Sequence, residues 1–248
     1  MSAALAGRRV LVTGGSSGIG AATARAAATA GARVAVLGRD SERVTAVAVE
    51  IGGVAVTADL TDLGVVPAAL EDAVQGLGGL DSVVHGAGTM VAGSVADTDP
   101  ARWREMFDVN VVGLLAVTRA AIPHLLVAST GNSVRAPSLV LMSSMSGRRI
   151  ARPESGVYAA SKAAVHMVAE TLRLELQPQG VRVSTIAPGF VRTPLADRLP
   201  EGELREYYRA RLMEDGLEPD VVADAVVHVL AQPPGVTVVE YALVPTAQ

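Results

Sequence analysis

The residues with the most evident chemistry are Tyr158 and Lys162, in the segment YAASK. A separation of four residues places both side chains on one face of a helix, one turn apart. An ammonium beside a phenol favours the phenolate, so the pair predicts a tyrosine pKa lowered from about 10 toward neutral pH. Such a tyrosine can act as a general acid or base; an ordinary ion-and-phenol pair on a helix surface is the alternative.

Lysine itself is informative at position 162. The chain contains twenty arginines and this single lysine. A compact ammonium can donate to ribose hydroxyls, whereas a planar guanidinium is a poorer substitute. The position therefore predicts a requirement for lysine chemistry, although the bias toward arginine could by itself make lysine scarce.

The segment TGGSSGIG, Thr13–Gly20, follows an apolar run and precedes a helical pattern. Glycines in such a turn let the backbone approach a pyrophosphate, and the free N–H groups of the helix start face the anion. The spacing is G-x-x-x-G-x-G, and a simple tight turn is the alternative. The predicted cofactor contacts in this turn are Gly14, Ser16, Ser17, Gly18, Ile19 and Gly20.

Cofactor choice should depend on the segment VLGRD, at the end of the second predicted strand. An acidic residue there would bind a ribose diol, but Gly38 and Arg39 occupy the place, and a guanidinium suits a 2′-phosphate. NADP(H) is therefore expected in preference to NAD(H). The alternative is that Arg39 is a solvated loop residue, with Asp40 or Ser41 capping the next helix. Asp59 and the adjacent Leu60 are expected near the adenine, although Asp59 could simply end a strand.

Composition narrows the class of protein. A net charge of −4 offers no general attraction for nucleic acid or anionic membranes. The absence of cysteine removes disulfides and thiolate metal sites and fits a cytoplasmic protein. The apolar stretch 111–128 is interrupted by Arg119, Pro123 and His124, which predicts a buried helix and not a membrane span. The start MSAALAGRRV lacks the apolar core of a signal peptide.

Apolar runs rich in β-branched residues alternate with segments of helical periodicity, which predicts one α/β domain over residues 1–248. We expect a Rossmann-like, doubly wound, seven-stranded and mostly parallel sheet with helices on both faces, and functional residues just after the strands. The expected strands are Arg9–Thr13, Arg33–Leu37, Val54–Thr57, Ser82–Val84, Ser138–Met142, Arg182–Ile186 and Thr237–Leu243. The expected helices include Ile19–Ala30, Val65–Leu77, Trp103–Val127, Tyr158–Gln177 and Asp220–Ala231. Gly31 and Gly180 are expected to end helices.

With LMSSMSG after the fifth strand and DVNVVG in the fourth helix, nearly the whole chain resembles the short-chain dehydrogenase/reductase family of compact, single-domain enzymes. The resemblance implies that Tyr158 and Lys162 are the catalytic pair and that Ser144 polarises a substrate carbonyl. Ser143 and Ser146 are competing candidates, because the interval to Tyr158 is about one residue longer than expected. Asn110 matches the residue that holds a water in a proton relay to the lysine.

The segment PGFVRTP, Pro188–Pro194, resembles the family stretch that contacts the nicotinamide carboxamide through the Val191 backbone and Thr193, with Pro188 and Gly189 beside them. The chain departs from the family after the fourth strand, where His85-Gly86-Ala87-Gly88 replaces the usual N-N-A-G. His85 could form a comparable hydrogen bond or leave a looser site. Ala87 and Gly88 still permit close cofactor approach. No metal site is expected, because no second ligand lies at a suitable spacing from His85.

These features predict an NADP(H)-dependent oxidoreductase that moves hydride between nicotinamide and a ketone, aldehyde or secondary alcohol. The alternatives are a non-catalytic NADP(H)-binding sensor or scaffold, and a cofactor-recycling epimerase or dehydratase. The substrate is expected among the loops 89–98, 145–157 and 195–216, near Met90, Met145, Leu195, Tyr207, Tyr208 and Met213. Arg148, Arg149 and Arg152 could meet an anionic substrate or form a solvated loop. The resemblance also implies a homodimer or homotetramer.

Overall fold

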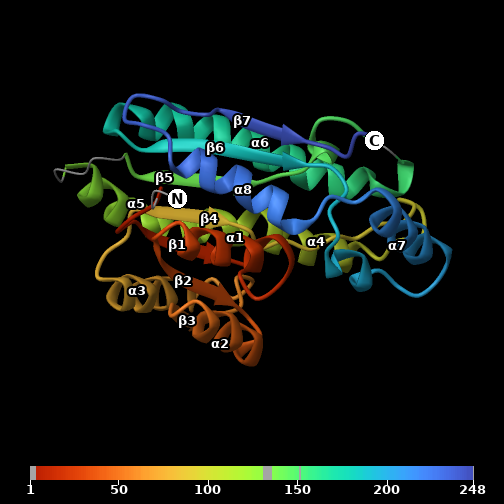
Figure 1. Ribbon diagram of the computed structural model, residues 1–248. Coiled ribbons are helices and arrows are strands. Elements are labelled where there is room, and N and C mark those ends of the chain that lie inside the picture. The colour runs from red at the N-terminus through yellow and green to blue at the C-terminus, as the bar shows by residue number, and fades with distance from the viewer. Residues whose placement is uncertain (1–3, 131–135, 151, 248) are drawn as a thin grey trace.

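The computed structural model describes residues 4–130, 136–150 and 152–247, and these form one seven-stranded sheet with the order β3-β2-β1-β4-β5-β6-β7 (Figure 1). Every neighbouring pair of strands is parallel. The strands are β1 (Arg9–Thr13), β2 (Arg33–Gly38), β3 (Val54–Thr57), β4 (Ser82–His85), β5 (Ser138–Met142), β6 (Arg182–Pro188) and β7 (Glu240–Leu243). The expected Rossmann-like doubly wound fold is confirmed.

The central strands are apolar because both of their faces are covered. All residues of β4, β5 and β6 are buried. The edge strand β7 is different: it begins at Glu240, three residues later than expected, and its four residues are half-buried or exposed. An edge strand with one neighbour has less need of a continuous apolar sequence.

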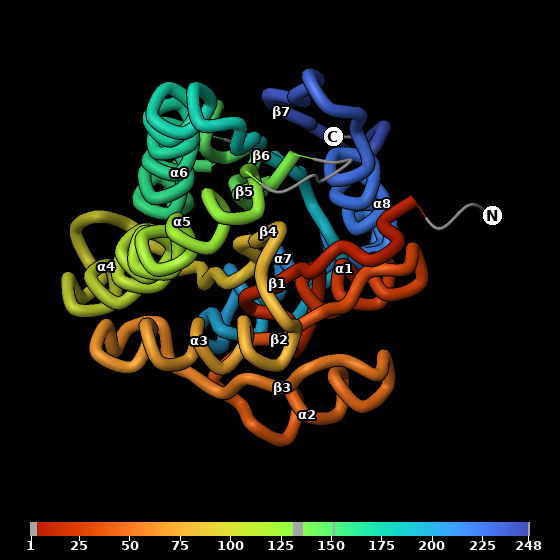
Figure 2. The backbone as a smooth tube through the Cα atoms, turned by 90° about the vertical axis from the view of Figure 1, so that its left-hand side faces the viewer, coloured from red at the N-terminus to blue at the C-terminus, as the bar shows by residue number. Residues whose placement is uncertain are grey.

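Two layers of helices cover the sheet, as the end-on view shows (Figure 2). The larger core cluster packs α3 (Val66–Leu77), α5 (Leu114–Thr130) and α6 (Gly156–Leu176) on one face. The other packs α1 (Gly18–Thr29), α2 (Ser41–Glu50) and α8 (Pro219–Leu230) on the opposite face. Asp40 caps α2 by accepting from the Arg43 N–H, which is the cap named in the alternative interpretation of Arg39. Gly31 and Gly180 have positive φ at helix ends, as expected.

The helix expected over Trp103–Val127 is longer and is composite. It consists of α4 (Pro100–Phe107), a π-helical segment at Asp108–Gly113 and then α5. Of the helices described, the continuous run Pro100–Thr130 has the length and hydropathy of a membrane span, with 33% of its apolar window buried. Core helices of soluble proteins meet the same criterion, and Val117, Ala121 and Leu125 pack in the core.

A third apolar cluster lies beyond the carboxyl ends of the strands and contains Tyr158, Met90, Leu199 and Tyr208. It is closed by a 3₁₀ segment (Pro194–Arg198) and α7 (Glu203–Asp215), inside the region expected as a substrate loop. Short 3₁₀ turns at Met145–Gly147, Pro153–Ser155 and Gln177–Gln179 complete the described elements. Ala151, within the expected loop 145–157, and the first three residues of the N-terminal segment lie outside the described residues.

Candidate active site

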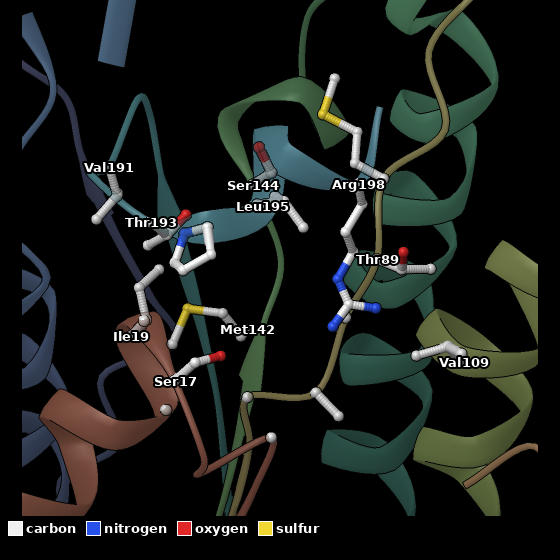
Figure 3. Close-up of a pocket in the computed structure, with 18 of the residues that line it drawn as sticks. Ser17, Ile19, Thr89, Val109, Met142, Ser144, Val191, Thr193, Leu195 and Arg198 are labelled. Atoms are coloured by element: carbon white, nitrogen blue, oxygen red, sulfur yellow. The ribbon is translucent and has the colours of Figure 1, made fainter. Parts of the chain in front are cut away.

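A cavity of about 640 Å³ opens at the carboxyl ends of the strands, where the parallel sheet predicted it. In Figure 3 the glycine turn contributes Ser17 and Ile19 on one side, Thr89 and Val109 lie opposite, and Ser144 and Leu195 lie above. The predicted site residues that line it are Gly14, Ser16, Ser17, Gly18, Ile19, Gly20, Arg39, Asp59, Leu60, Ala87, Gly88, Ser144, Tyr158, Lys162, Pro188, Gly189, Val191 and Thr193. The predicted residue Asn110 is buried and is not among the lining residues.

Gly14 and Gly20 of the glycine turn are packed so closely that a side chain at either position would collide with backbone atoms. Gly14 has φ +64°, and a Cβ there would lie 2.6 Å from the backbone of Ala87. A Cβ at Gly20 would lie 2.2 Å from the Gly14 carbonyl oxygen. At the neighbouring Gly18, the nearest atom to a Cβ would be Thr193 Cγ2, 3.1 Å away. The glycines therefore let the turn pack against Ala87 and against itself at the start of α1, where free N–H groups suit a pyrophosphate.

The polar residues after β2 and β3 meet at one end of the cavity. Arg39 is exposed and near enough to Asp59 to help lower the pKa of that carboxyl. The larger cause is the Thr61 N–H, which donates to Asp59 Oδ1 over 2.9 Å. Asp59 therefore has a local turn role as well as a place on the cavity wall. Arg43 and Arg198 also line the cavity but were not predicted, because loop and helix arginines give no signal in a single sequence.

The structure reverses one prediction about Tyr158. Burial raises the pKa of its phenol to about 12, although interaction with the Ser144 hydroxyl opposes the shift. Lys162 Nζ lies 6.0 Å from the centroid of the Tyr158 ring and donates to the Met142 carbonyl over 3.0 Å. The expected lowering of the tyrosine pKa is therefore wrong here, because desolvation of the buried phenol is the largest effect on that pKa.

Lys162 is 5% exposed, and burial lowers its pKa to about 8. The side chain still carries its charge at neutral pH, and it has the Met142 carbonyl as acceptor. A Cβ built on Gly88 would lie 3.5 Å from Nζ, so the absence of a side chain at position 88 leaves the ammonium open to the cavity.

The two adjacent serines have different surroundings. Ser143 Oγ donates to the Lys162 backbone carbonyl over 2.9 Å, which commits it to the packing of β5 on α6. Ser144 Oγ has only a long contact of 3.4 Å to the Pro188 carbonyl, accepts from the Ser146 N–H, and interacts with Tyr158. Of the two, Ser144 has the hydroxyl that is free to meet a substrate.

Asn110 sits in the π-helical segment and is 1% exposed. Its amide donates to the Thr89 carbonyl and to Ser161 Oγ, both over 3.0 Å, and its Oδ1 accepts from the Thr89 N–H over 2.8 Å. Both amide hydrogens are therefore used. The side chain fixes the strand-to-helix connection at Thr89 beside Lys162, and a relay water would have to donate to an Asn110 carbonyl oxygen.

The departure at His85 and Gly86 has a packing explanation. His85 is buried, its Nε2 is 3.0 Å from Thr118 Oγ1, and burial lowers its pKa to about 3. His85 thus forms a hydrogen bond between β4 and α5, which was the first of the two expectations for this residue. A Cβ at Gly86 would lie 2.8 Å from the Thr13 carbonyl oxygen, so this sequence has no space for a second asparagine. Within the described residues no group of three or more His, Cys, Asp or Glu could hold a metal ion.

The substrate side of the cavity contains Met90, Met145, Leu195 and Tyr208, as expected. Tyr207 and Met213 do not line it: Tyr207 packs under the Arg152 guanidinium at 4.3 Å, and Met213 is 71% exposed. The three loop arginines separate. Arg148 pairs with Glu240, Arg149 is exposed away from the cavity, and Arg152 lines the cavity but pairs with Glu154.

The sequence matches one protein family and several oxidoreductases. The model of the short chain dehydrogenase family matches residues 8–204. An uncharacterised oxidoreductase of Staphylococcus epidermidis is 34% identical over 237 residues, which cover 95% of this chain and 96% of that protein. A counterpart from Staphylococcus saprophyticus is also 34% identical, with the same shares covered.

Solved structures agree with the sequence comparisons. The 3-ketoacyl-(acyl-carrier-protein) reductase of Brucella melitensis, complexed with NADH, superposes with a TM-score of 0.86, 30% identity and coverage of 97% of this chain and 98% of its own. A short chain dehydrogenase of Burkholderia cenocepacia, complexed with NADP, gives a TM-score of 0.83, 31% identity and coverage of 96% and 97%. The chain therefore belongs to the short-chain dehydrogenase/reductase family and is an oxidoreductase that uses a nicotinamide cofactor.

Proposed function

We propose that this protein is an NADP(H)-dependent carbonyl reductase of small metabolites or biosynthetic intermediates. The observation that carries the proposal is that Ser144, Tyr158 and Lys162 line the same cavity as the glycine turn. The turn fits a dinucleotide because it lines the cavity at the start of α1, where free N–H groups can bind a pyrophosphate. A bound nicotinamide would supply the hydride.

Three side chains have separate roles in the proposed reduction. Tyr158 holds its proton at neutral pH, because burial raises its pKa to about 12, and so it is ready to donate to a carbonyl oxygen. Ser144 donates a hydrogen bond to that oxygen as negative charge develops. Lys162 stays charged near pH 7, orients the cofactor ribose, and can return a proton toward Tyr158.

Arg39 supports NADP(H) as the preferred cofactor. It follows β2 at the edge of the cavity and forms no ion pair within 4 Å to any described residue. A guanidinium in this place suits a 2′-phosphate, whereas an acidic side chain would suit a ribose diol. Replacing Arg39 by Asp should move the cofactor preference toward NADH. An unchanged ratio of NADPH affinity to NADH affinity would show that Arg39 does not select the cofactor.

The remaining proposals concern the setting of the enzyme. We expect a single-domain cytoplasmic protein with a small-molecule substrate, and a homodimer or homotetramer formed on the exposed faces of α5 and α6. Leu115 on α5 and Met167 and Leu174 on α6 are large apolar side chains with 40%, 65% and 79% exposure, which such an interface would cover.

The test is a turnover assay with NADPH or NADH and a panel of aldehydes, ketones and oxo acids, followed by nicotinamide absorbance. The proposal predicts turnover of at least one carbonyl, faster with NADPH at subsaturating cofactor. NADPH binding without turnover of any carbonyl would instead favour the sensor or scaffold alternative.

A further inference from the structure

Three arginines from separate parts of the chain line the cavity, and the charges of Arg39 and Arg43 act on the guanidinium group of Arg198. Arg39 follows β2, Arg43 lies in α2, and Arg198 ends the 3₁₀ segment that follows β6. Many other arginines are neutralised by a carboxylate, as in the pairs Arg9–Asp81 and Arg25–Glu50. The side chains of these three form no such pair and no hydrogen bond within the part of the chain that is described.

Arg198 is the unexpected member of this arginine cluster, because it lies in the loop 195–216, which is expected to contact the substrate and not the cofactor. Figure 3 shows its side chain extending into the cavity, with Ser17 and Met142 on one side and Thr89 and Val109 on the other. Burial and the charges of Arg39 and Arg43 lower the pKa of Arg198, while Glu105 opposes the shift. Asp59 is near Arg39, and Asp197 also lines the cavity but is engaged by Arg209. The cluster therefore keeps an excess of positive charge, which an anion would neutralise.

The segment that carries Arg198 is tied to α7. Arg209 binds the Asp197 carboxylate over 2.6 Å, and Arg205 donates to the Asp197 carbonyl. Leu199 and Tyr208, on either side of this connection, pack in the same apolar cluster as Tyr158. The segment Pro194–Asp215, called the cover here, closes the substrate pocket. A ligand that binds Arg198 would therefore help to hold the whole cover in place.

We propose that Arg198 is a third ligand of the cofactor 2′-phosphate, supplied by the substrate cover, so that NADP(H) holds the Pro194–Asp215 cover closed while NAD(H) does not. This inference rests on the proposed use of NADP(H). It makes Arg198 a specificity-determining residue at the cofactor and a positioning residue for the cover of the active site.

The first test measures the dissociation constants of NADPH and NADH by calorimetry for wild type, Arg198→Ala and Arg198→Lys. In Arg198→Ala, loss of one charge-assisted contact should weaken NADPH binding about tenfold and leave NADH binding unchanged. The NADPH affinity of Arg198→Lys should lie between those of wild type and Arg198→Ala. Arg33→Ala is the matched control. Arg33 is an exposed arginine at the opposite end of β2, where it donates to the Gly76 carbonyl, so its loss removes the same charge from outside the cavity.

The second test follows tryptic cleavage in α7, whose Arg205, Arg209 and Arg211 are candidate cutting sites. At equal saturation, NADP⁺ should slow this cleavage more than NAD⁺ in wild type, and the difference should vanish in Arg198→Ala. Equal protection by both cofactors would overturn the inference.

The outcomes separate the inference from the function on which it rests. Equal weakening of both cofactors in Arg198→Ala, or no weakening of either, overturns the role of Arg198 and leaves the reductase standing if Arg39→Ala still loses NADPH selectively. A wild-type protein that binds NADH more tightly than NADPH would overturn both proposals together.

Discussion

The substitutions Gly14→Ala and Gly52→Ala compare two glycines with nearly the same backbone. Their φ angles are +64° and +61°, so alanine should cost about 1 kcal/mol at either place through left-handed strain. A Cβ at Gly52 meets nothing within 4 Å, whereas a Cβ at Gly14 would lie 2.6 Å from the Ala87 backbone. Forced repacking of this kind adds about 1–3 kcal/mol. The total for Gly14→Ala is therefore about 2–4 kcal/mol.

Thermal unfolding and NADPH titration of both variants separate the cost of backbone strain from the cost of forced repacking against Ala87. For a chain of this size, about 1 kcal/mol lowers the melting temperature by about 2–4 °C, which is the expectation for Gly52→Ala with unchanged NADPH binding. Gly14→Ala should melt lower still and lose at least tenfold in NADPH affinity, because the glycine turn and the Ala87 segment must separate. Normal NADPH binding in Gly14→Ala would refute the argument that this close approach shapes the cofactor site.

The other predictions concern buried polar groups. Ser144→Ala should lower kcat by about 10²–10³-fold, whereas Ser143→Ala should keep turnover and lose about 1 kcal/mol of stability; the reverse pattern in kinetics and melting would exchange their roles. Lys162 has its folded-state pKa lowered to about 8 from 10.5, so it destabilises the fold fully below pH 8 and progressively less up to pH 10.5. Lys162→Met should therefore be more stable than wild type in urea at pH 7, by a margin that shrinks at pH 9.5; a margin independent of pH would contradict this. The lowered pKa of His85 predicts stability that is present above pH 6.5 and is lost as pH falls toward 3. Denaturation curves at pH 7 and pH 4 should show a smaller loss for His85→Asn than for wild type, and equal losses would exclude His85 as the source.

Strand positions were predictable because the buried parallel strands leave continuous β-branched runs in the sequence, as at Arg9–Thr13 and Ser138–Met142. The strand predicted at Thr237–Leu243 begins only at Glu240, since an exposed edge strand does not need a continuous apolar sequence. The π-helical segment around Asn110 has no signature in a single sequence, because its hydrogen bonds shift while its residue types remain those of a helix. Helix α7 has little apolar periodicity of its own and is held by its contacts over the cavity.

At the site, residue types and spacing were sufficient to find the glycine turn, Tyr158 and Lys162, but not the balance of energies among them. The direction of the Tyr158 pKa depends on how deeply the phenol is buried, which spacing cannot show. The choice between Ser143 and Ser144 depends on which hydroxyl faces α6. Arg198 could be found only in three dimensions, because the chain segments that bring it to Arg39 are far apart in sequence.

The central claim is that Tyr158 donates the proton in a nicotinamide-dependent reduction. The most direct measurement compares wild type and Tyr158→Phe in the same samples, with NADPH affinity from calorimetry and carbonyl reduction from NADPH absorbance. We predict that Tyr158→Phe binds NADPH within about twofold of wild type, since the phenol hydroxyl adds little to cofactor affinity, and loses turnover by at least 10³-fold. Turnover that survives in Tyr158→Phe would contradict the account and assign the proton to another group.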